Sequence, residues 1–210
     1  MYERTVKRIL DVAVAALSLV ILSPLFLVVS IAIKIDSRGP VFFKQKRAGR
    51  GRALFDIYKF RTMSTDAPRD VPTNDLRGAK QYITRVGKVL RVTSIDELPQ
   101  LINILKGDMS LIGPRPALWN QFELLEWRDK FGANDLRPGL SGWAQVNGRD
   151  YLSLDLEKKA RRDGEYAHNV SFLFDLKCFF LTLVKVVNRQ GIVEGKESKS
   201  YPLGDTEDDE

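Results

Sequence analysis

A long apolar segment stands out near the start of the chain. Residues 12–33 include no charged side chain. About 22 residues would reach across a hydrocarbon core of about 30 Å if they formed one helix. No small-residue cleavage site follows, because Ile33 is succeeded by Lys34, so we expect the segment to be retained and not removed as a signal peptide. The pattern therefore predicts a membrane helix.

A proline in the middle of this segment favours a re-entrant helix. Pro24 lacks an N–H and collides with the carbonyl of Val20, so a kink is expected, with Ser23 satisfying the released carbonyl. Each half then measures roughly 15–18 Å, about half the hydrocarbon thickness. Basic residues flank both sides, and the positive-inside rule places such flanks in the cytoplasm, which a hairpin satisfies better than a span. A kinked span stays open. The flanking bases are Arg4, Lys7, Arg8, Lys34, Arg38, Lys44, Lys46 and Arg47.

Short strands and a loop follow the apolar segment. Residues 41–46 and 54–60 have the composition of two strands, and residues 48–51 form a hairpin-like connection between them. Residues 64–80 are polar and contain prolines and a glycine, which predicts a loop.

Helical periodicity returns in the second half of the chain. Apolar residues at helical spacing from Leu98 to Leu105 predict an amphipathic helix that Gly107 ends. Phe122 and Leu125 indicate a second helix, to which Trp119 is a candidate addition. Residues 172–187 are very apolar but carry Asp175, Lys177 and Lys185, so they suit either a core helix or an interfacial one, and both alternatives stay open.

Charge changes the picture more than overall composition does. Five of the 27 acidic residues lie within residues 205–210, so the rest of the chain carries 33 bases against 22 acids, a net charge of +11. A body this basic indicates an anionic partner such as a phosphate substrate, acidic lipid or nucleic acid. A single cysteine, Cys178, excludes an internal disulfide and a cysteine-based zinc cluster, and a single histidine, His168, excludes a histidine-rich metal site.

Two neighbouring acids, Asp96 and Glu97, begin the predicted Leu98–Leu105 helix. One interpretation is structural: Ser94 and Glu97 fit a capping box, and acids suit the first turn of a helix. However, a helix capped at Ser94 puts Pro99 where an N–H should already donate. A helix that starts at Asp96 relieves this conflict and leaves both acids free to face a ligand.

Several basic residues lie in rigid, turn-like contexts. Prolines or glycines adjoin three of them, and two flank Phe60 at the end of a predicted strand. A fixed backbone that carries arginine is suited to hold a phosphate through two parallel hydrogen bonds. Neither a GxGxxG loop nor a P-loop is present. The candidate phosphate-binding residues are Lys59, Arg61, Arg115, Arg137 and Arg149.

These motifs resemble the small monotopic polyprenyl-phosphate phosphoglycosyl transferases, also called bacterial sugar transferases. The resemblance covers residues 2–192, includes Ser23-Pro24, and excludes the acidic tail. It is carried by long contiguous segments: Tyr58-Lys-Phe-Arg-Thr-Met63, Ser94-Ile-Asp-Glu-Leu-Pro-Gln-Leu101, residues 105–116 (LKGDMSLIGPRP) and residues 137–149 (RPGLSGWAQVNGR).

The resemblance implies an α+β fold, a mostly helical monotopic membrane protein with a re-entrant N-terminal helix, interfacial amphipathic helices and a small β-hairpin. Residues 1–35 would be the re-entrant helix, residues 36–195 the catalytic domain, and residues 196–210 a disordered acidic tail. The protein would lie on the cytoplasmic face of the bacterial inner membrane. Its candidate protein partners are downstream glycosyltransferases and a second copy of the chain; nucleic acid is not expected.

The resemblance also implies the chemistry. Asp96 would be the nucleophile, Glu97 would complete the pair, and both would serve a required Mg²⁺. The donor would be a UDP-sugar, the acceptor undecaprenyl phosphate, and the leaving group UMP. Both substrates are anionic, which suits the basic body. A non-catalytic scaffold that binds anionic lipid or nucleic acid is the alternative; it explains the charge and the anchor, but not an acidic pair among rigidly framed arginines.

Overall fold

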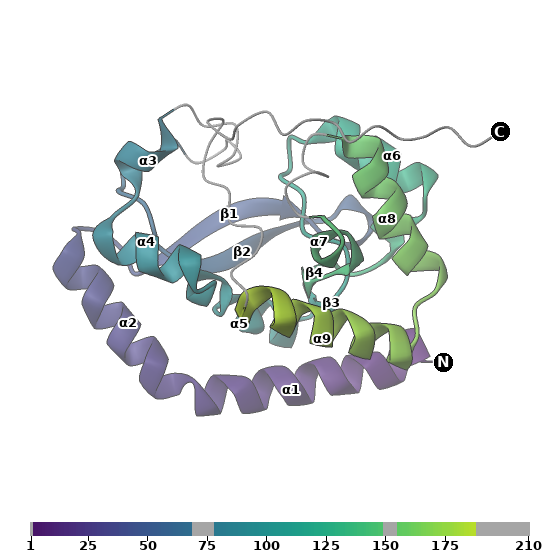
Figure 1. Cartoon of the computed structure of the whole chain (residues 1–210), viewed down its shortest axis with the longest axis horizontal. Helices are drawn as coiled ribbons and strands as arrows, with labels where there is room; N and C mark the ends of the chain where they lie inside the picture. Colours follow the sequence, from purple (N-terminus) through teal and green to yellow (C-terminus); the bar gives the residue numbers. More distant parts are fainter. Residues whose placement is uncertain (1, 69–77, 149–154, 188–210) are drawn as a thin grey trace.

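The computed structural model describes residues 2–68, 78–148 and 155–187 and shows a mostly helical α+β fold, as predicted (Figure 1). The strands are β1 (Phe42–Ala48), β2 (Leu54–Phe60), β3 (Ser110–Ile112) and β4 (Gly139–Ser141). The helices and helical turns are η1 (Tyr2–Val6), α1 (Lys7–Ile21), α2 (Ser23–Asp36), η2 (Arg50–Arg52), α3 (Ala79–Tyr82), α4 (Arg85–Val92), η3 (Ile95–Glu97), α5 (Gln100–Lys106), α6 (Phe122–Lys130), η4 (Ala133–Asp135), α7 (Trp143–Val146), α8 (Leu156–His168) and α9 (Phe172–Val187).

The apolar N-terminal segment forms two helices that meet at a bend of 61°. The break falls at Leu22, and Pro24 lies in the first turn of α2, where a missing N–H costs nothing. Ser23 Oγ donates to the carbonyl of Val20 at 2.8 Å, so the predicted kink and its predicted repair are both confirmed. Within the described part of the chain, no helix alone is long and apolar enough to cross a bilayer; α1 and α2 meet that requirement only together, across the bend.

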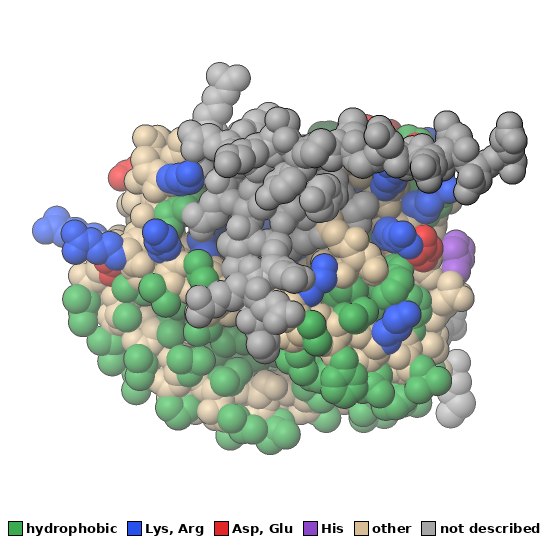
Figure 2. Space-filling view, viewed as in Figure 1, with side chains coloured by type: hydrophobic (Ala, Val, Ile, Leu, Met, Phe, Trp, Pro, Cys, Tyr) green, Lys and Arg blue, Asp and Glu red, His purple; other side chains and the backbone are tan. Residues whose placement is uncertain are grey.

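Helices α1, α2 and α9 share an exposed apolar surface. Hydrophobic side chains gather along the edge of the molecule where these helices run (Figure 2). The sequence left open whether residues 172–187 form a core helix or an interfacial one. Helix α9 has features of both, because it buries Asp175 and Cys178 on one side and exposes large apolar side chains on the other. The exposed apolar residues of the three helices include Ile9, Leu17, Val20, Ile21, Leu27, Val28, Ile31, Ile35, Leu173, Phe179, Phe180 and Val184.

Three polar side chains in the first turns of α1 hold this helix in place, one against α9 and two against the rest of the protein. Lys7 Nζ lies 2.6 Å from Asp175 Oδ2. Arg8 donates to the carbonyls of Ile104 and Leu105 at the end of α5. Asp11 accepts hydrogen bonds from the Ser110 hydroxyl and the Leu111 amide. Lys7 and Arg8 therefore have structural partners and are more than the flanking charges that the sequence suggested.

The Asp175 carboxylate is the centre of this attachment. It accepts hydrogen bonds from the hydroxyls of Tyr2 and Tyr166 as well as from Lys7. The Tyr166 hydroxyl also lies 3.3 Å from the carbonyl of Ile112 in β3. One carboxylate thereby joins the N-terminal turn, α1, α8 and α9.

The predicted hairpin and helix are confirmed. Strands β1 and β2 pair antiparallel, with Phe42 opposite Phe60 and Ala48 opposite Leu54. Helix α5 ends at Gly107, whose φ of 93° suits glycine, as the sequence indicated. Asn103, fully buried on α5, accepts from the amide of Tyr58 and donates to the carbonyl of Asp56, so α5 closes the free edge of β2.

Other elements were not anticipated from the sequence. Strands β3 and β4 pair parallel over three residues each, too short for a periodic signal. Helix α4 is capped by Thr84, whose side chain accepts from the amide of Gly87. A Cβ on Gly87 would lie 2.0 Å from the carbonyl oxygen of Thr62, so this contact requires glycine. The predicted second helix is α6, and Trp119 lies before it.

The ends of two predicted segments can be compared with helices of the structure. Helix α2 ends at Asp36, close to the predicted end of the membrane segment. Val29 and Ile33 pack with Phe60 and Leu90 in one cluster, so α2 shares a core with the body of the protein. Part of the predicted 64–80 loop belongs to α3, and residues 69–77 lie outside the described residues, as does the predicted tail at 196–210.

We predict that Asp175→Ala strongly destabilises the protein. It leaves the ammonium of Lys7 buried without its carboxylate, which costs about 3–5 kcal/mol of unfolding free energy in comparable cases. Thermal unfolding of the detergent-solubilised protein measures the loss. The control is Glu157→Ala, which breaks an exposed pair with Arg161 and is expected to change stability little. Equal melting temperatures for the two variants would contradict the role given to Asp175.

Candidate active site

The acidic pair lies in a short 3₁₀ turn, η3, immediately before α5. Helix α5 proper begins at Gln100, with Pro99 at its N-cap, so the conflict noted for Pro99 does not arise. The capping box suggested by the sequence is absent: Ser94 has a left-handed φ of 56° and its side chain makes no capping hydrogen bond. The prediction that the helix starts at Asp96 is also wrong. Even so, neither acid caps the helix, as that prediction expected.

Glu97 is held by two of the predicted basic residues. Its Oε1 lies 2.7 Å from Lys59 Nζ and 2.6 Å from Arg115 Nη2, and its Oε2 lies 3.2 Å from Arg115 Nη1. The Arg115 contact is therefore two-pronged, as the planar guanidinium allows. The charge of Glu97 raises the pKa of Arg115, and burial lowers the pKa of Lys59. This arrangement fixes Glu97 in place.

Asp96 has a different environment from its neighbour. Its carboxylate forms no hydrogen bond or ion pair with the described residues, and it is influenced by their charges alone. Burial raises the pKa of Asp96, while the positive charges of Lys59, Arg91 and Arg115 oppose that shift. An anionic oxygen without a committed partner, surrounded by cations, is available to react with a ligand.

Three further cations near the pair were missed by sequence reasoning. Arg91 on α4 acts on Asp96 and donates through Nε to the Thr62 hydroxyl at 3.2 Å. Arg47 on β1 donates to the Pro116 carbonyl at 3.0 Å, beside Arg115. Lys159 on α8 lies close enough to Arg47 and Arg115 that, besides burial, their positive charges lower its pKa. Arg91 could have been inferred, because it lies in the last turn of α4, shortly before Asp96. Nothing in the sequence distinguishes Lys159 from the other bases of its helix.

The site carries an excess of positive charge. Four cations, Lys59, Arg115, Arg91 and Arg47, lie near the two carboxylates Asp96 and Glu97, and a fifth, Lys159, lies near Arg47 and Arg115. Clustered cations repel one another, and the repulsion is relieved when an anion binds among them. The arrangement therefore favours a ligand with several negative charges.

Arg137 lies at the other end of α5 from the acidic pair. The segments that carry Arg115 and Arg137 are neighbours, since the amide of Gly139 donates to the carbonyl of Pro114 at 2.8 Å, but the two side chains are bound by different partners. Arg137 Nε donates to the carbonyl of Gly107, the residue that ends α5. The structure thus brings Lys59 and Arg115 to the acidic pair and leaves Arg137 apart from them.

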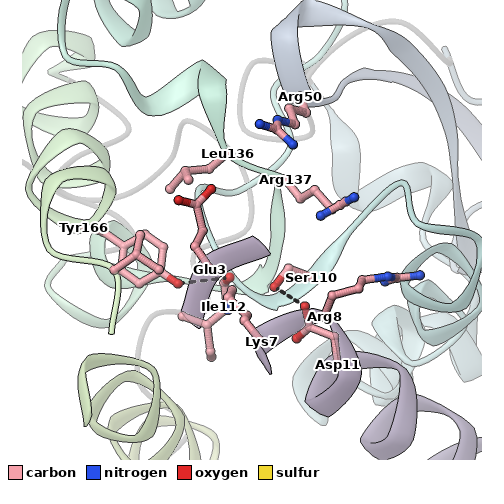
Figure 3. Close-up of a pocket in the computed structure, with 11 residues that line it drawn as sticks. Glu3, Lys7, Arg8, Asp11, Arg50, Ser110, Ile112, Leu136, Arg137 and Tyr166 are labelled. Atoms are coloured by element: carbon pink, nitrogen blue, oxygen red, sulfur yellow. Dashed lines mark hydrogen bonds between the residues drawn. The ribbon is translucent and has the colours of Figure 1, made fainter. Parts of the chain in front are cut away.

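Arg137 lines a separate hollow between the start of α1 and strand β3 with the segment before β4 (Figure 3). The polar groups there largely satisfy one another, since Asp11 accepts from Ser110 and the guanidinium of Arg8 is turned to backbone carbonyls. The lining residues are Glu3, Lys7, Arg8, Asp11, Arg50, Ser110, Ile112, Leu136, Arg137, Tyr166 and Val170. This hollow does not include the acidic pair.

Of the two remaining predicted residues, the structure describes Arg61 alone, and Arg61 does not join the acidic pair. Arg61 is buried and donates to the carbonyls of Ser37 and Arg38 and to the Ser37 hydroxyl, so it holds the connection after α2. Arg149 lies outside the described residues.

The site offers few ligands for a metal ion. Among the described residues, no group of three or more His, Cys, Asp or Glu side chains could hold one. The oxygens on offer are those of Asp96 and Glu97, and Glu97 already accepts from Lys59 and Arg115. Mg²⁺ commonly binds through one or two carboxylates together with substrate phosphates and water. The residues therefore fit a Mg²⁺ that arrives with a phosphate substrate better than a preformed metal site.

Comparison with known proteins identifies the family. Residues 2–189 match the model of the bacterial sugar transferases. The chain therefore belongs to the bacterial sugar transferase family, as its motifs indicated. Membership implies an enzyme associated with a membrane, and the comparisons give no support to a non-catalytic scaffold.

Three relatives illustrate the range of this family. An uncharacterized sugar transferase of Bacillus subtilis, EpsL, is 41% identical over 186 residues, which are 89% of each chain. The undecaprenyl-phosphate glucose phosphotransferase of Komagataeibacter xylinus is 40% identical, over 86% of this chain and 36% of that protein. An N-acetylgalactosamine phosphotransferase of Aeromonas hydrophila, which uses a UDP-sugar and undecaprenyl phosphate by its name, is 39% identical over 89% of this chain and 44% of its own. The chain thus spans less than half of the latter two, and they transfer different sugars.

We predict that Arg115→Lys lowers kcat by about 10²-fold, because lysine keeps the charge but cannot hold Glu97 at two points. Steady-state release of the nucleotide product measures the change. The matched control is Arg161→Lys, an exposed arginine on α8 that pairs with Glu157, and we expect its kcat to stay at the wild-type value. A wild-type rate for Arg115→Lys would remove Arg115 from the active site.

Proposed function

We propose that this protein transfers a sugar-1-phosphate from a UDP-sugar to undecaprenyl phosphate, giving undecaprenyl-diphosphate-sugar and UMP. The carrying observation is the carboxylate of Asp96, which has no hydrogen-bond partner among the described residues and lies beside Glu97, Lys59 and Arg115. Family membership and the names of the relatives support the substrate classes. The reaction is the first membrane step of glycoconjugate assembly, such as exopolysaccharide or capsule.

Asp96 acts as the nucleophile in the first of two steps. A carboxylate oxygen of Asp96 attacks the β-phosphorus of the UDP-sugar, the bond from that phosphorus to the bridging oxygen breaks, and UMP leaves with the bonding electrons. The sugar-phosphoryl group stays on Asp96 as a mixed anhydride. An ionised carboxylate needs no general base, which agrees with a site built without histidine.

The acceptor completes the reaction in the second step. An oxygen of undecaprenyl phosphate attacks the same phosphorus, the bond to Asp96 breaks, and its electrons return to the carboxylate. The choice of Asp96 over Glu97 rests on their contacts, since Glu97 is committed to Lys59 and Arg115 while Asp96 is not.

The surrounding charges favour both steps. Lys59 and Arg115 fix Glu97, and their charges with that of Arg91 allow an anionic donor to approach an anionic nucleophile. Mg²⁺, which the family resemblance implies, would be bound by oxygens of Asp96 and Glu97 with the donor diphosphate, and would neutralise phosphate charge.

The apolar surface of α1, α2 and α9 lies in the cytoplasmic leaflet of the inner membrane. Its large side chains are unpartnered within the described chain and form one edge of the molecule (Figure 2). Ala15 of α1 packs with Leu101 and Ile104 of α5, so the helix that follows the acidic pair rests on the membrane layer. The acidic pair then lies close to the surface at which a lipid acceptor and a soluble donor meet. The 61° bend between α1 and α2 supports a re-entrant arrangement, with both ends on the cytoplasmic side.

We predict a covalent adduct on Asp96. Incubating wild type with UDP-sugar and Mg²⁺, without lipid, is expected to release up to one equivalent of UMP and to add sugar-phosphate mass to the intact protein. Asp96→Asn is expected to abolish both, because an amide is a poor nucleophile of similar shape. Asp108→Asn is the control: it changes a carboxylate at the opposite end of α5 and is expected to form the adduct. An active Asp96→Asn enzyme, or an adduct mapped to another residue, would refute the assignment. A panel of UDP-sugars in the same assay identifies the donor.

We predict that both flanks of the bent helix pair face the cytoplasm. Single cysteines replacing Glu3 and Lys46, both exposed and on either side of the pair, are tested with a membrane-impermeant thiol reagent. Neither is expected to react in intact spheroplasts, and both are expected to react after permeabilisation. The native Cys178 is buried and serves as the background control. Reaction of Glu3→Cys alone from outside would show that the pair spans the membrane.

A further inference from the structure

Helix α8 forms one side of the active site through a contact between small residues. Ala160 is fully buried and belongs to a cluster with Ala48 and Ala117. Ala48 follows Arg47 in β1, and Ala117 is two residues beyond Arg115; the amide of Ala48 also donates to the carbonyl of Ala117 at 3.0 Å. This packing brings Lys159, the neighbour of Ala160, to the arginines of the site.

Lys159 differs from the charged residues around it because it has no partner in the described part of the chain. Its ammonium forms no ion pair or hydrogen bond with any described residue, although the side chain is only partly exposed. Asp163, one turn further along α8, is fully buried and engaged twice by Arg128 of α6, at 2.8 and 2.5 Å. The adjacent Lys158, in contrast, is 75% exposed and lies 3.4 Å from Asp155.

The neighbouring Arg47 also has unused hydrogen-bonding capacity. Its Nη1 donates to Pro116 and its Nη2 to Gln45, whereas its Nε is buried and finds no partner among the described residues. A buried donor without an acceptor is costly, and so is placing Arg47, Arg115 and Lys159 near one another. A bound anion among these groups would offset both costs.

We propose that Lys159, with Arg47, binds a phosphate group of the substrates in this active site. The inference rests on the proposed function and extends the anion site from the acidic pair toward α8. The phosphate belongs either to the donor diphosphate or to the lipid acceptor, and the two half-reactions separate these sources.

The alkaline pH dependence provides a direct readout of Lys159. Burial lowers the pKa of Lys159 to about 8, and Arg128, Arg115 and Arg47 act in the same direction, against the charge of Asp163. The ammonium is therefore present below pH 8 and is lost as the pH rises through that value. Since kcat/KM reports the free enzyme, its value for wild type is expected to fall above about pH 8.

The experiment compares Lys159→Gln, Lys159→Arg and Lys158→Gln in the full-length protein. Rates of UMP release without acceptor, and of transfer from the preformed adduct to undecaprenyl phosphate, are measured between pH 6.5 and about pH 9.5. Lys159→Gln is expected to lower kcat/KM for at least one half-reaction by about 10–100-fold, the effect of losing a hydrogen bond to a charged group. Lys159→Arg is expected to retain activity at pH 7 and to lose the decline near pH 8, and Lys158→Gln to match wild type.

The outcomes separate this inference from the proposed function. A defect of Lys159→Gln in UMP release assigns the contact to the donor, and a defect only in the second half-reaction assigns it to the acceptor; both support the inference. Wild-type kcat/KM for Lys159→Gln in both half-reactions, or a decline near pH 8 that persists in Lys159→Arg, overturns it. If wild type itself forms no adduct, the proposed function fails, whatever the variants show. A lowered melting temperature with loss of activity in Lys159→Arg would mean a structural role and would also overturn the inference.

Discussion

The joining of the two ends of the chain's helical layer, α1 and α9, depends on one buried carboxylate. Asp175 of α9 accepts hydrogen bonds from Tyr2 and Lys7 in the N-terminal helical segment and from Tyr166 of α8. A buried ion pair is not a strong source of stability in itself, but removing one partner is costly. The pairing therefore acts as a constraint: the first turns of α1 and α9 must lie together, and exposed apolar side chains of these helices gather along one edge of the molecule (Figure 2).

The same layer positions the reactive residues. Arg8 and Asp11 of α1 bind the end of α5 and the backbone of β3, and Ala15 packs beneath α5. On its other side, α5 closes the edge of β2 through Asn103, which bonds Tyr58 and Asp56 on either side of Ile57. Lys59 follows Tyr58 directly, so the hydrogen bonds of Asn103 also determine where the Lys59 ammonium meets Glu97. The acidic turn is thereby held between the apolar helix α1 and strand β2.

Two adjacent carboxylates acquire different roles from their surroundings. Glu97 is neutralised and immobilised by Lys59 and Arg115, whereas Asp96 has charges near it but no hydrogen bond from the described residues. Preorganised cations of this kind stabilise charge that develops on a transferring phosphoryl group, because they need not reorient during the reaction. The excess of cations over carboxylates also explains why an anion is needed to complete the site.

Local patterns in the sequence were enough to predict the apolar segment, its kink at Pro24 and the hairpin. They also predicted the helix that Gly107 ends and the acidic pair. Each of these features depends on residues that lie close together in the chain. Long, contiguous motifs indicated the family for the same reason. Only the tertiary structure decided which bases reach Asp96 and Glu97. Arg115 and Arg137 occupy similar proline-rich segments, yet the Arg115 side chain binds Glu97 whereas the Arg137 side chain binds the carbonyl of Gly107 at the other end of α5. Arg61 is used at the end of α2. The elements of Arg47 and Lys159 meet through packing of Ala48, Ala117 and Ala160, and α4, which carries Arg91, packs on α2. No spacing along the chain encodes these contacts.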